Sequence, residues 1–290
     1  MKTVLVTGAG GQLGKCIELL TSDDDDIDWL FLDSKELDLS STCDLHQVFS
    51  SKRIDFCINC AAYTNVEKAE SDKEKAFLVN AIAVKNLAEI CKKNRTVLFH
   101  FSTDYVFDGT ATTPYKENDA TAPINVYGES KLMGEKYIQE ICHSYFIFRT
   151  SWLYSQYGHN FYKTILKKAN EGANLNITTA QTGTPTNANH LARLVVELIK
   201  ENNKNYGLYH YSNTGETTWY GFAKEILRIS GNLDSVSLKE DNSYQTIAKR
   251  PEYSVLDKTK VLTGLSKPVS NWEEALSELY KIDVRRLDFQ

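Results

Sequence analysis

The sequence predicts an α/β fold in which a doubly wound parallel sheet carries helices on both faces. The first half alternates short β-branched or aromatic runs with helical patterns, which is the order of repeated strand–helix units. A glycine-rich turn joins the first of these strands to the first helix. After about residue 150 the alternation loosens, and we expect a second, smaller α/β unit there.

The first half contains the clearest elements. The expected strands span residues 3–7, 29–33, 56–59, 96–101 and 145–148. The expected helices span residues 12–20, 43–50, 71–93 and 127–142, and later helices span 189–201, 218–229 and 271–280. Four consecutive aspartates, Asp23–Asp26, indicate a solvated loop rather than a metal site, because adjacent acids repel one another.

Composition argues against several classes of function. Hydrophobic residues make up 42% and charged residues 24% of the chain, as in ordinary globular proteins. A net charge of −5 argues against a general nucleic-acid binder. No apolar run approaches the roughly 20 residues that cross a bilayer. The apolar start, Met1–Gly8, is interrupted by glycine too early for a signal peptide, so we expect a cytoplasmic protein without a membrane partner.

The six cysteines are scattered along the chain. Cys57 and Cys60 have C-x-x-C spacing, which can indicate redox or metal chemistry. They lie in a buried-strand pattern, no second such pair exists, and no histidine follows at ligand spacing. Small core residues are therefore the favoured interpretation, and no metal site is predicted.

A nucleotide site is predicted at the end of the first strand. Gly8, Gly11 and Gly14 recur at three-residue spacing between a strand and a helix. Glycines allow a tight turn and close approach of a ligand, and the amino end of a helix favours a pyrophosphate. The spacing differs from G-x-G-x-x-G, and a turn without a ligand is the alternative. The candidate contacts are Gly8, Gly10, Gly11, Gln12, Leu13 and Gly14.

The second strand ends at another candidate cofactor position. Asp33 can accept hydrogen bonds from the adenosine ribose and disfavours a 2′-phosphate, a preference that Ser34 and Lys35 soften. Asp38 and Leu39 are candidate adenine contacts. Strand ends of a parallel sheet meet at one edge, so these positions are expected to converge with the glycine-rich turn.

The third strand ends in small residues, Ala61 and Ala62, which let a cofactor approach the backbone. We therefore expect residues 1–150 to form a dinucleotide-binding domain, to which parts of 167–215 return. Residues 151–290 are expected to form most of a smaller substrate-binding domain that provides the far wall of a cleft.

A hydroxyl, a phenol and an amine are predicted to face this cleft. Thr103 follows the fourth strand, where its hydroxyl can donate to a substrate carbonyl. Tyr127 and Lys131 lie four residues apart, on one face of a helix. An ammonium at this place is expected to lower the pKa of the phenol, so that the tyrosine can exchange a proton beside a redox carbonyl.

These motifs together resemble the extended short-chain dehydrogenase/reductase superfamily. Within it, the chain is similar to the dTDP-4-dehydrorhamnose reductase family over nearly its whole length. The similar segments are residues 61–70, 102–109, 125–128, 149–154, 183–186, 207–210 and 250–251.

The resemblance implies a Rossmann-like domain, NADPH or NADH as the cofactor, and a nucleotide-linked 4-ketosugar as the substrate. Hydride would reach the C4 ketone of dTDP-6-deoxy-L-lyxo-4-hexulose and give dTDP-L-rhamnose for cell-surface polysaccharides. Thr103 would hold the carbonyl oxygen, Tyr127 would protonate the alkoxide, and Lys131 would bind the nicotinamide ribose. Further implied cofactor contacts are Ala61, Ala62, Tyr63, Asn80 and Tyr127, and implied substrate contacts are Thr64, Val66, Asp104, Tyr105, Trp152 and Arg250.

One departure from the family concerns metal and partners. Some members are described as dimers bridged by magnesium through glutamates. The matching positions here are Lys15 and His190, and a cation at Lys15 would repel a metal. We carry over no metal site and expect a monomer or a homodimer.

Two alternatives stay open. Another nucleotide-sugar reductase, or an epimerase that recycles a tightly bound nicotinamide, would reuse Tyr127 and Lys131. A non-catalytic subunit resembling the regulatory subunit of methionine adenosyltransferase would keep the fold only to bind a partner. The presence of Thr103 together with that pair argues against such a subunit.

Overall fold

The computed structural model describes residues 1–243 and 245–287 and contains a six-stranded sheet in the order β10-β5-β4-β3-β1-β2. All of its neighbouring strands pair in parallel. The order reverses at β1, which lies between β2 and β3, as the doubly wound prediction requires. The strands are β1 (Lys2–Thr7), β2 (Ile27–Leu32), β3 (Phe56–Asn59), β4 (Val97–Thr103), β5 (Tyr145–Thr150) and β10 (Gly207–His210).

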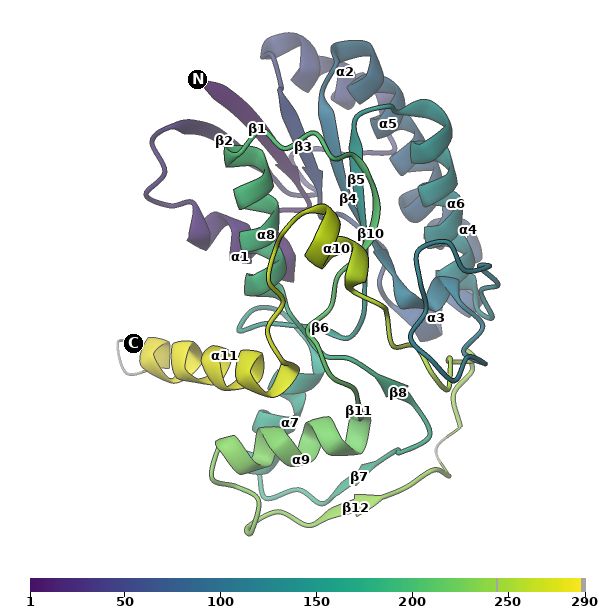
Figure 1. Ribbon diagram of the computed structural model, residues 1–290, viewed down its shortest axis with the longest axis vertical. Helices are drawn as coiled ribbons and strands as arrows, with labels where there is room; N and C mark the ends of the chain where they lie inside the picture. Colours follow the sequence, from purple (N-terminus) through teal and green to yellow (C-terminus); the bar gives the residue numbers. More distant parts are fainter. Residues whose placement is uncertain (244, 288–290) are drawn as a thin grey trace.

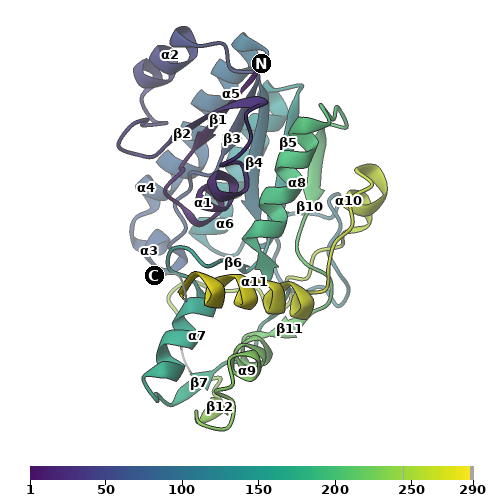
Figure 2. The ribbon, with the colours of Figure 1, turned by 90° about the vertical axis from the view of Figure 1, so that its left-hand side faces the viewer.

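Helices cover both faces of this sheet (Figures 1 and 2). One face carries α1 (Gln12–Leu20) and α8 (Ala188–Lys200). The other carries α2 (Thr42–Ser51), α5 (Ala83–Asn94) and α6 (Val126–Ile141). Because successive strand residues point to opposite faces, Val4 and Val6 pack in the first layer and Leu5 packs in the second.

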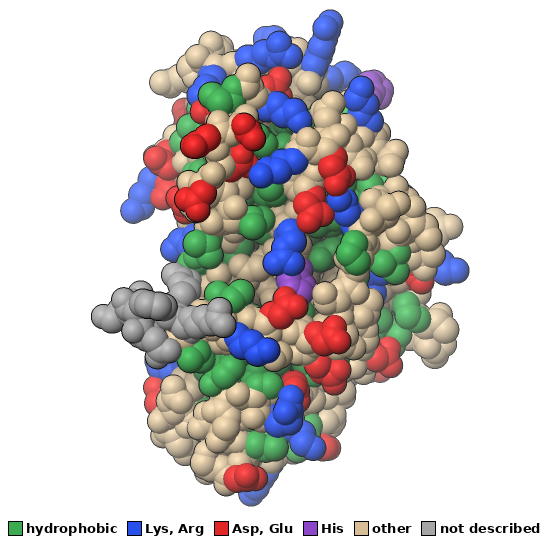
Figure 3. Space-filling model, turned by 60° about the vertical axis from the view of Figure 1, so that its left-hand side comes forward, with side chains coloured by type: hydrophobic (Ala, Val, Ile, Leu, Met, Phe, Trp, Pro, Cys, Tyr) green, Lys and Arg blue, Asp and Glu red, His purple; other side chains and the backbone are tan. Residues whose placement is uncertain are grey.

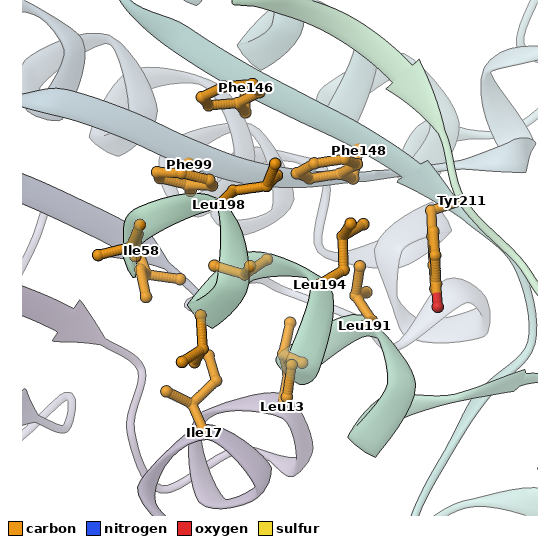
Figure 4. Packing of buried hydrophobic residues seen from close by; sticks show 14 of the residues in the cluster. Leu13, Ile17, Ile58, Phe99, Phe146, Phe148, Leu191, Leu194, Leu198 and Tyr211 are labelled. Carbon is orange, nitrogen blue, oxygen red and sulfur yellow. The ribbon is translucent and has the colours of Figure 1, made fainter. Parts of the chain in front are cut away.

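The layer beneath α8 is filled by aromatic rings. Phe99 of β4 and the pair Phe146 and Phe148 of β5 face the leucines of α8 (Figure 4). The rings of Phe99 and Phe146 stack with centroids 4.8 Å apart. Both α8 and the edge strand β10 come from the later half of the sequence, so that half completes the sheet formed by the first.

The helix predicted over residues 71–93 is largely confirmed, because residues 73–94 are helical without a break, as α4 (Lys73–Phe77), the π-helical turn η1 (Leu78–Ile82) and α5. Its predicted start is wrong, because a separate short helix, α3 (Val66–Ser71), ends where the prediction begins. Asp72 leaves helical geometry, with φ −124° and ψ 47°, and this separates α3 from α4. The wide turn contains Asn80, whose side chain bonds both the N–H and the carbonyl of Tyr63.

The remaining elements form a smaller lobe at the carboxyl ends of the sheet strands (Figure 1). Its core contains Tyr154, Tyr162, Phe222 and Leu276. Its helices are α7 (Phe161–Asn170), α9 (Trp219–Ile229) and α11 (Trp272–Leu287), and α10 (Thr259–Gly264) packs against the main sheet. Its short paired strands are β6 (Leu153–Tyr154) with β9 (Thr186–Asn187), β7 (Leu175–Ile177) with β12 (Leu238–Glu240), and β8 (Thr182–Gly183) with β11 (Thr217–Thr218).

Helix α7 was not predicted from the sequence. Asn160 caps its amino end by accepting from the Lys163 N–H, and the side of the helix that carries Tyr162, Ile165 and Ala169 is buried.

Acidic and basic side chains are interspersed over the face shown in Figure 3. Within the two described ranges, no helix combines the length and apolarity that a membrane crossing requires.

Candidate active site

A cavity of about 560 Å³ opens where the carboxyl ends of the sheet strands meet the smaller lobe. The glycine-rich turn after β1 forms one end, and β4 and α6 form its floor. Trp152, Phe161 and Trp219 form the opposite wall. The site residues predicted from sequence that line this cavity are Gly10, Gly11, Gln12, Leu13, Ala62, Thr64, Val66, Thr103, Asp104, Tyr105, Tyr127, Lys131 and Trp152.

A second hollow, of about 810 Å³, lies at the amino ends of β1 and β2. Lys52, Arg53 and Lys200 line it, and each is paired with an aspartate. None of the site residues predicted from sequence lines this hollow. The predicted catalytic residues Thr103, Tyr127 and Lys131 therefore gather at the first cavity, although it is the smaller of the two.

The glycine-rich turn fits a dinucleotide. Gly8 has φ +65°, and a Cβ there would lie 2.5 Å from the Ala61 nitrogen, so only glycine lets β1 and β3 come this close. Helix α1 begins after Gly11 without a side-chain cap. Its first N–H groups are thus available to a pyrophosphate at the positive end of the helix.

Two buried hydroxyls also face the cavity without a partner. Ser102 Oγ and Thr150 Oγ1 have no hydrogen-bond partner within the described part of the chain. They lie at the ends of the neighbouring strands β4 and β5. Buried polar atoms are nearly always bonded in folded proteins, so this arrangement suits a polar ligand.

Thr103, Tyr127 and Lys131 come together in this cavity from two elements. Thr103 ends β4, where its Oγ1 donates to Asp104 Oδ1 at 2.9 Å and accepts from the Tyr105 N–H at 3.2 Å. Tyr127 and Lys131 lie in the first turns of α6, which Asn125 caps by accepting from an N–H of the helix. Lys131 Nζ donates to the Phe101 carbonyl at 2.6 Å.

The proton states of the pair differ from the expectation. Burial raises the pKa of Tyr127 to about 12, although its hydrogen bond with Thr103 partly opposes this effect. Burial lowers the pKa of Lys131 to about 8, against the attraction of Glu135. The prediction that Lys131 brings the tyrosine pKa below 10 is wrong here, because loss of solvent raises that pKa, and Lys131 Nζ donates to a backbone carbonyl.

Asp104 adds a third unusual group. Burial raises the pKa of its carboxyl to about 6, although hydrogen bonds from Ser254 and Thr103 oppose the rise. The same carboxylate contributes to the raised pKa of Tyr127. Perturbed groups gathered in one cavity are typical of catalytic sites.

The aromatic wall is held in a strained geometry. Trp152 has φ +45°, which is rare for a bulky residue, and its indole stacks on Trp219 with centroids 3.7 Å apart. Gly183 borders the same indole, and a Cβ there would lie 2.7 Å from it. Trp219 is fixed in turn by its N–H, which donates to Gln181 at 2.9 Å.

Arg250 is not among the residues that line the cavity. Its Nη1 lies 2.5 Å from Glu67 Oε1, and Glu67 Oε2 accepts from the Ile247 N–H. The guanidinium also lies near Tyr105, whose hydroxyl it bonds. Arg250 therefore sits beside the cavity, paired with an acid from α3.

The other predicted cofactor residues lie outside the lining. Asp33 is next to Gly10, because a Cβ on that glycine would be 3.8 Å from the aspartate Cβ. Asp38 accepts from the Ser40 N–H, and Leu39 is buried in the core beneath it. The remaining residues outside the lining are Gly8, Gly14, Ala61, Tyr63 and Asn80.

Sequence reasoning predicted that the smaller lobe forms the far wall, but it missed several of the residues there. Trp219, Phe161, His159 and Asn160 line the cavity, and none was predicted. Gln12 Oε1 accepts from Ser155 Oγ at 3.0 Å and from Asn160 Nδ2 at 2.8 Å, which ties α1 to this wall. An Asn directly before an apolar helical run was the available signal for Asn160.

The C-x-x-C pair shows no bond. None of the six cysteines forms a disulfide, and Cys57 is buried in β3. Cys60 borders the cavity, and burial raises the pKa of its thiol, so it is a poor nucleophile.

Comparisons with known proteins agree with one another. A family model described as RmlD substrate binding domain matches residues 1–284. The chain is 35% identical to dTDP-4-dehydrorhamnose reductase of Aggregatibacter actinomycetemcomitans, over 96% of this chain and 98% of that protein. It is 39% identical to the Escherichia coli K12 reductase of the same name, over 83% and 84% of the two chains. The crystal structure of dTDP-4-dehydrorhamnose reductase from Bacillus anthracis strain Ames in complex with NADP has a TM-score of 0.92 and 36% identity, and covers 97% of this chain and 99% of that one.

Proposed function

The chain belongs to the family of the RmlD substrate-binding domain, and we propose that it catalyses the NAD(P)H-dependent reduction of dTDP-4-dehydrorhamnose. The ketone at C4 becomes a hydroxyl, which gives dTDP-L-rhamnose for cell-surface polysaccharide biosynthesis. The observation that carries this proposal is one cavity that contains a glycine-rich turn, Thr103, Tyr127 and Lys131 opposite a wall of aromatic rings.

The cofactor would lie along the carboxyl ends of β1 and β3. The turn over residues 8–14 and the amino end of α1 would hold its pyrophosphate, and Asp33 would bind the adenosine ribose. Lys131 would bind the nicotinamide ribose. Reduced nicotinamide bound there supplies the hydride. The relative of known structure that contains NADP supports a dinucleotide at this place.

Tyr127 would donate the proton that the new hydroxyl group requires. Its raised pKa keeps the phenol protonated at neutral pH, which is the state a reductase needs before turnover. Thr103 would donate to the ketone oxygen and stabilise the charge that develops there. Its only hydroxyl proton is directed to Asp104, so the hydroxyl has to turn when the ketone arrives.

The sugar nucleotide would occupy the side of the cavity nearest the smaller lobe. Trp152 would offer the free face of its stacked indole to the apolar side of the sugar ring. Arg250 would exchange its partner Glu67 for the diphosphate, since a guanidinium can bond two phosphate oxygens at once. Thr64, Val66, Asp104 and Tyr105 would complete the contacts.

The domain division follows from this arrangement. We propose residues 1–150 as the dinucleotide-binding domain, with parts of 167–215 returning to it and 151–290 forming most of the substrate-binding domain. The pairing of β10 with β5 supports that return. We further propose that the enzyme is cytoplasmic, since both expected substrates are charged nucleotides. We also propose that it acts as a monomer or a homodimer.

Oxidation of NADPH and of NADH, followed with dTDP-4-dehydrorhamnose and with UDP-linked 4-ketosugars, tests the proposal. The expected result is turnover of the dTDP-linked ketosugar in preference to the others, with dTDP-L-rhamnose as the product. Turnover of only another ketosugar would reassign the substrate. Tightly bound nicotinamide without net NAD(P)H consumption would indicate an epimerase, and no turnover at all would favour a binding subunit.

A further inference from the structure

A line of buried polar side chains crosses the centre of the sheet and ends at Lys131. Thr7 of β1, Asn59 of β3 and His100 of β4 are register partners on neighbouring strands. Each is at most 1% exposed. Hydrogen bonds join Thr7 to Asn59 at 2.9 Å and Asn59 to His100 at 3.1 Å, and His100 Nε2 lies 3.5 Å from Lys131 Nζ. The roles proposed so far do not use Thr7, Asn59 or His100.

The backbone fixes which way the Asn59 amide points. Asn59 Oδ1 lies 3.1 Å from the Ala61 nitrogen, and a backbone N–H can only donate. The oxygen of the amide must therefore face Ala61 and the Thr7 hydroxyl. The NH₂ group then faces His100 and has to find an acceptor there.

His100 can accept from that NH₂ group only with an unprotonated Nδ1. A neutral imidazole with an acceptor at Nδ1 carries its proton on Nε2. Burial and the charge of Lys131 both lower the pKa of His100 well below its ordinary value, so the ring is neutral. Its Nε2–H is consequently directed at the amine of Lys131.

This N–H meets the two forms of the lysine differently. An ammonium has no lone pair, so the Lys131 ammonium and the His100 N–H would face each other as two donors with no acceptor between them. A neutral amine has a lone pair and can accept the His100 N–H. The Phe101 carbonyl, at 2.6 Å, accepts from Lys131 on another side in either form.

We propose that His100 is a positioning residue, oriented by Asn59, whose Nε2–H favours the neutral amine of Lys131 and so eases release of the lysine proton. The proposal rests on the proposed function of Tyr127 and Lys131. After Tyr127 gives its proton to the alkoxide, Lys131 passes one proton to the phenolate and becomes an amine. His100 keeps its own proton throughout, and Lys131 regains a proton from solvent.

Other groups also act on Lys131. Glu135, one turn further along α6, favours the ammonium. Tyr127, Asp104, Tyr105 and Cys60 line the same cavity as the amine. These groups are retained in the variants below, so any difference between the variants belongs to Asn59 and His100.

The tautomer can be measured directly by ¹⁵N NMR of the imidazole in the full-length protein without substrate. His100→Gln identifies the signal by its loss. The expected result is a neutral ring protonated at Nε2 near pH 7. A ring protonated at Nδ1, or an imidazolium, would overturn the proposal without any kinetic measurement.

Asn59→Asp provides the kinetic test, because a carboxylate accepts from Nδ1–H and turns the lone pair of Nε2 toward Lys131. The fall of kcat/KM at alkaline pH should move upward by about one pH unit more than in Asn59→Asp/His100→Leu, which carries the same charge without the ring. Equal shifts in the two variants would refute the role of His100.

His100→Gln is the conservative control. Its amide can accept from Asn59 through the carbonyl oxygen and present an N–H to Lys131, so the alkaline limb of the pH profile should stay in place. His100→Leu presents no N–H to Lys131 and should move the limb upward, and an equal shift in His100→Gln would contradict the proposal. Failure of the proposed function is distinguishable, because it abolishes ketosugar turnover and leaves the NMR tautomer as predicted.

Discussion

Asp104, Tyr127 and Lys131 each depart from the ordinary pKa in the direction that favours the uncharged form. Burial is the leading cause for all three. A charge costs more in a cavity closed to solvent than in water, so the carboxyl and the phenol bind protons more tightly and the amine binds its proton less tightly. A bound substrate and cofactor would change the surroundings of these three groups and therefore their pKa values.

Asp104→Asn should stabilise the protein at alkaline pH. The pKa of the carboxyl rises from 3.8 when unfolded to about 6 when folded, so between these values the folded protein binds more protons and loses stability as pH rises. Above about pH 6 the loss is complete and amounts to at most about 3 kcal/mol. In urea unfolding, the free energy of unfolding of Asp104→Asn minus that of the wild type should be more positive at about pH 8 than at about pH 4. An equal free-energy difference at the two pH values would contradict this prediction.

Tyr127→Phe should lower kcat by about 10²–10⁴-fold while the Kd for NADPH stays near the wild-type value, because the variant loses only the proton donor. Stopped assays of product formation and quenching of NADPH fluorescence measure the two quantities. Tyr137→Phe, on the same helix but outside the cavity lining, is the matched control and should retain kcat. Near-normal turnover by the first variant would exclude Tyr127 as the donor.

At the scale of elements, β8 positions the aromatic wall through Gly183. Gly183→Ala should push the Trp152 indole out of place, raise KM for the ketosugar and cost about 1–3 kcal/mol of stability from overpacking. Gly264→Ala is a matched control, since a Cβ there has an ordinary contact at 3.7 Å. An unchanged KM in Gly183→Ala would show that the wall does not contact the sugar.

Helix α6 is fastened to β5 by a buried ion pair. Arg149 Nη2 lies 2.7 Å from Glu135 Oε2, and both side chains are buried. Arg149→Met should cost about 3–5 kcal/mol, because it leaves Glu135 charged and unpaired. Arg149→Met/Glu135→Leu should recover part of that loss in urea unfolding. Arg228→Met breaks an exposed pair with Glu225 and should change stability by less than about 1 kcal/mol.

The sequence was informative where one element determines a position. Tyr127 and Lys131 share a helix face, and Thr103 ends a strand, so these local patterns, taken together with the glycine-rich turn and the family resemblance, predicted that the three residues meet in one cleft. Trp219 and Phe161 reach the cavity through the packing of α7 and α9, which is not a local property of either segment. The π-helical turn that follows α4 contains Asn80, whose side chain makes tertiary hydrogen bonds to Tyr63 that no helical pattern contains.

The whole molecule is organised around a cavity that both halves must complete. Gln12 links the first helix to Ser155 and Asn160, so a ligand at the glycine-rich turn also meets the later wall. The proton state of the reactive pair depends on this closure, because burial shifts the pKa of both of its members. Cavity shape and chemistry are thus coupled across the sequence.

NADPH at about 100 times its Kd should raise the free energy of unfolding by about 2.7 kcal/mol, in a single transition. Tryptophan fluorescence reports mainly on the later half, where Trp152, Trp219 and Trp272 lie, and circular dichroism reports on the whole sheet. The two probes should coincide with and without cofactor. Separate transitions would show that the halves unfold independently.

The late arrival of α8 has a consequence for biosynthesis. Strands β1 to β5 are complete at Thr150, but the helix that covers their aromatic face ends at Lys200. At typical translation rates the ribosome needs roughly 3–10 s for those 50 residues. During that interval Phe99, Phe146 and Phe148 have no α8 above them, so the nascent chain offers a chaperone an apolar surface. Slowing translation between these two points should therefore increase aggregation of the newly made protein.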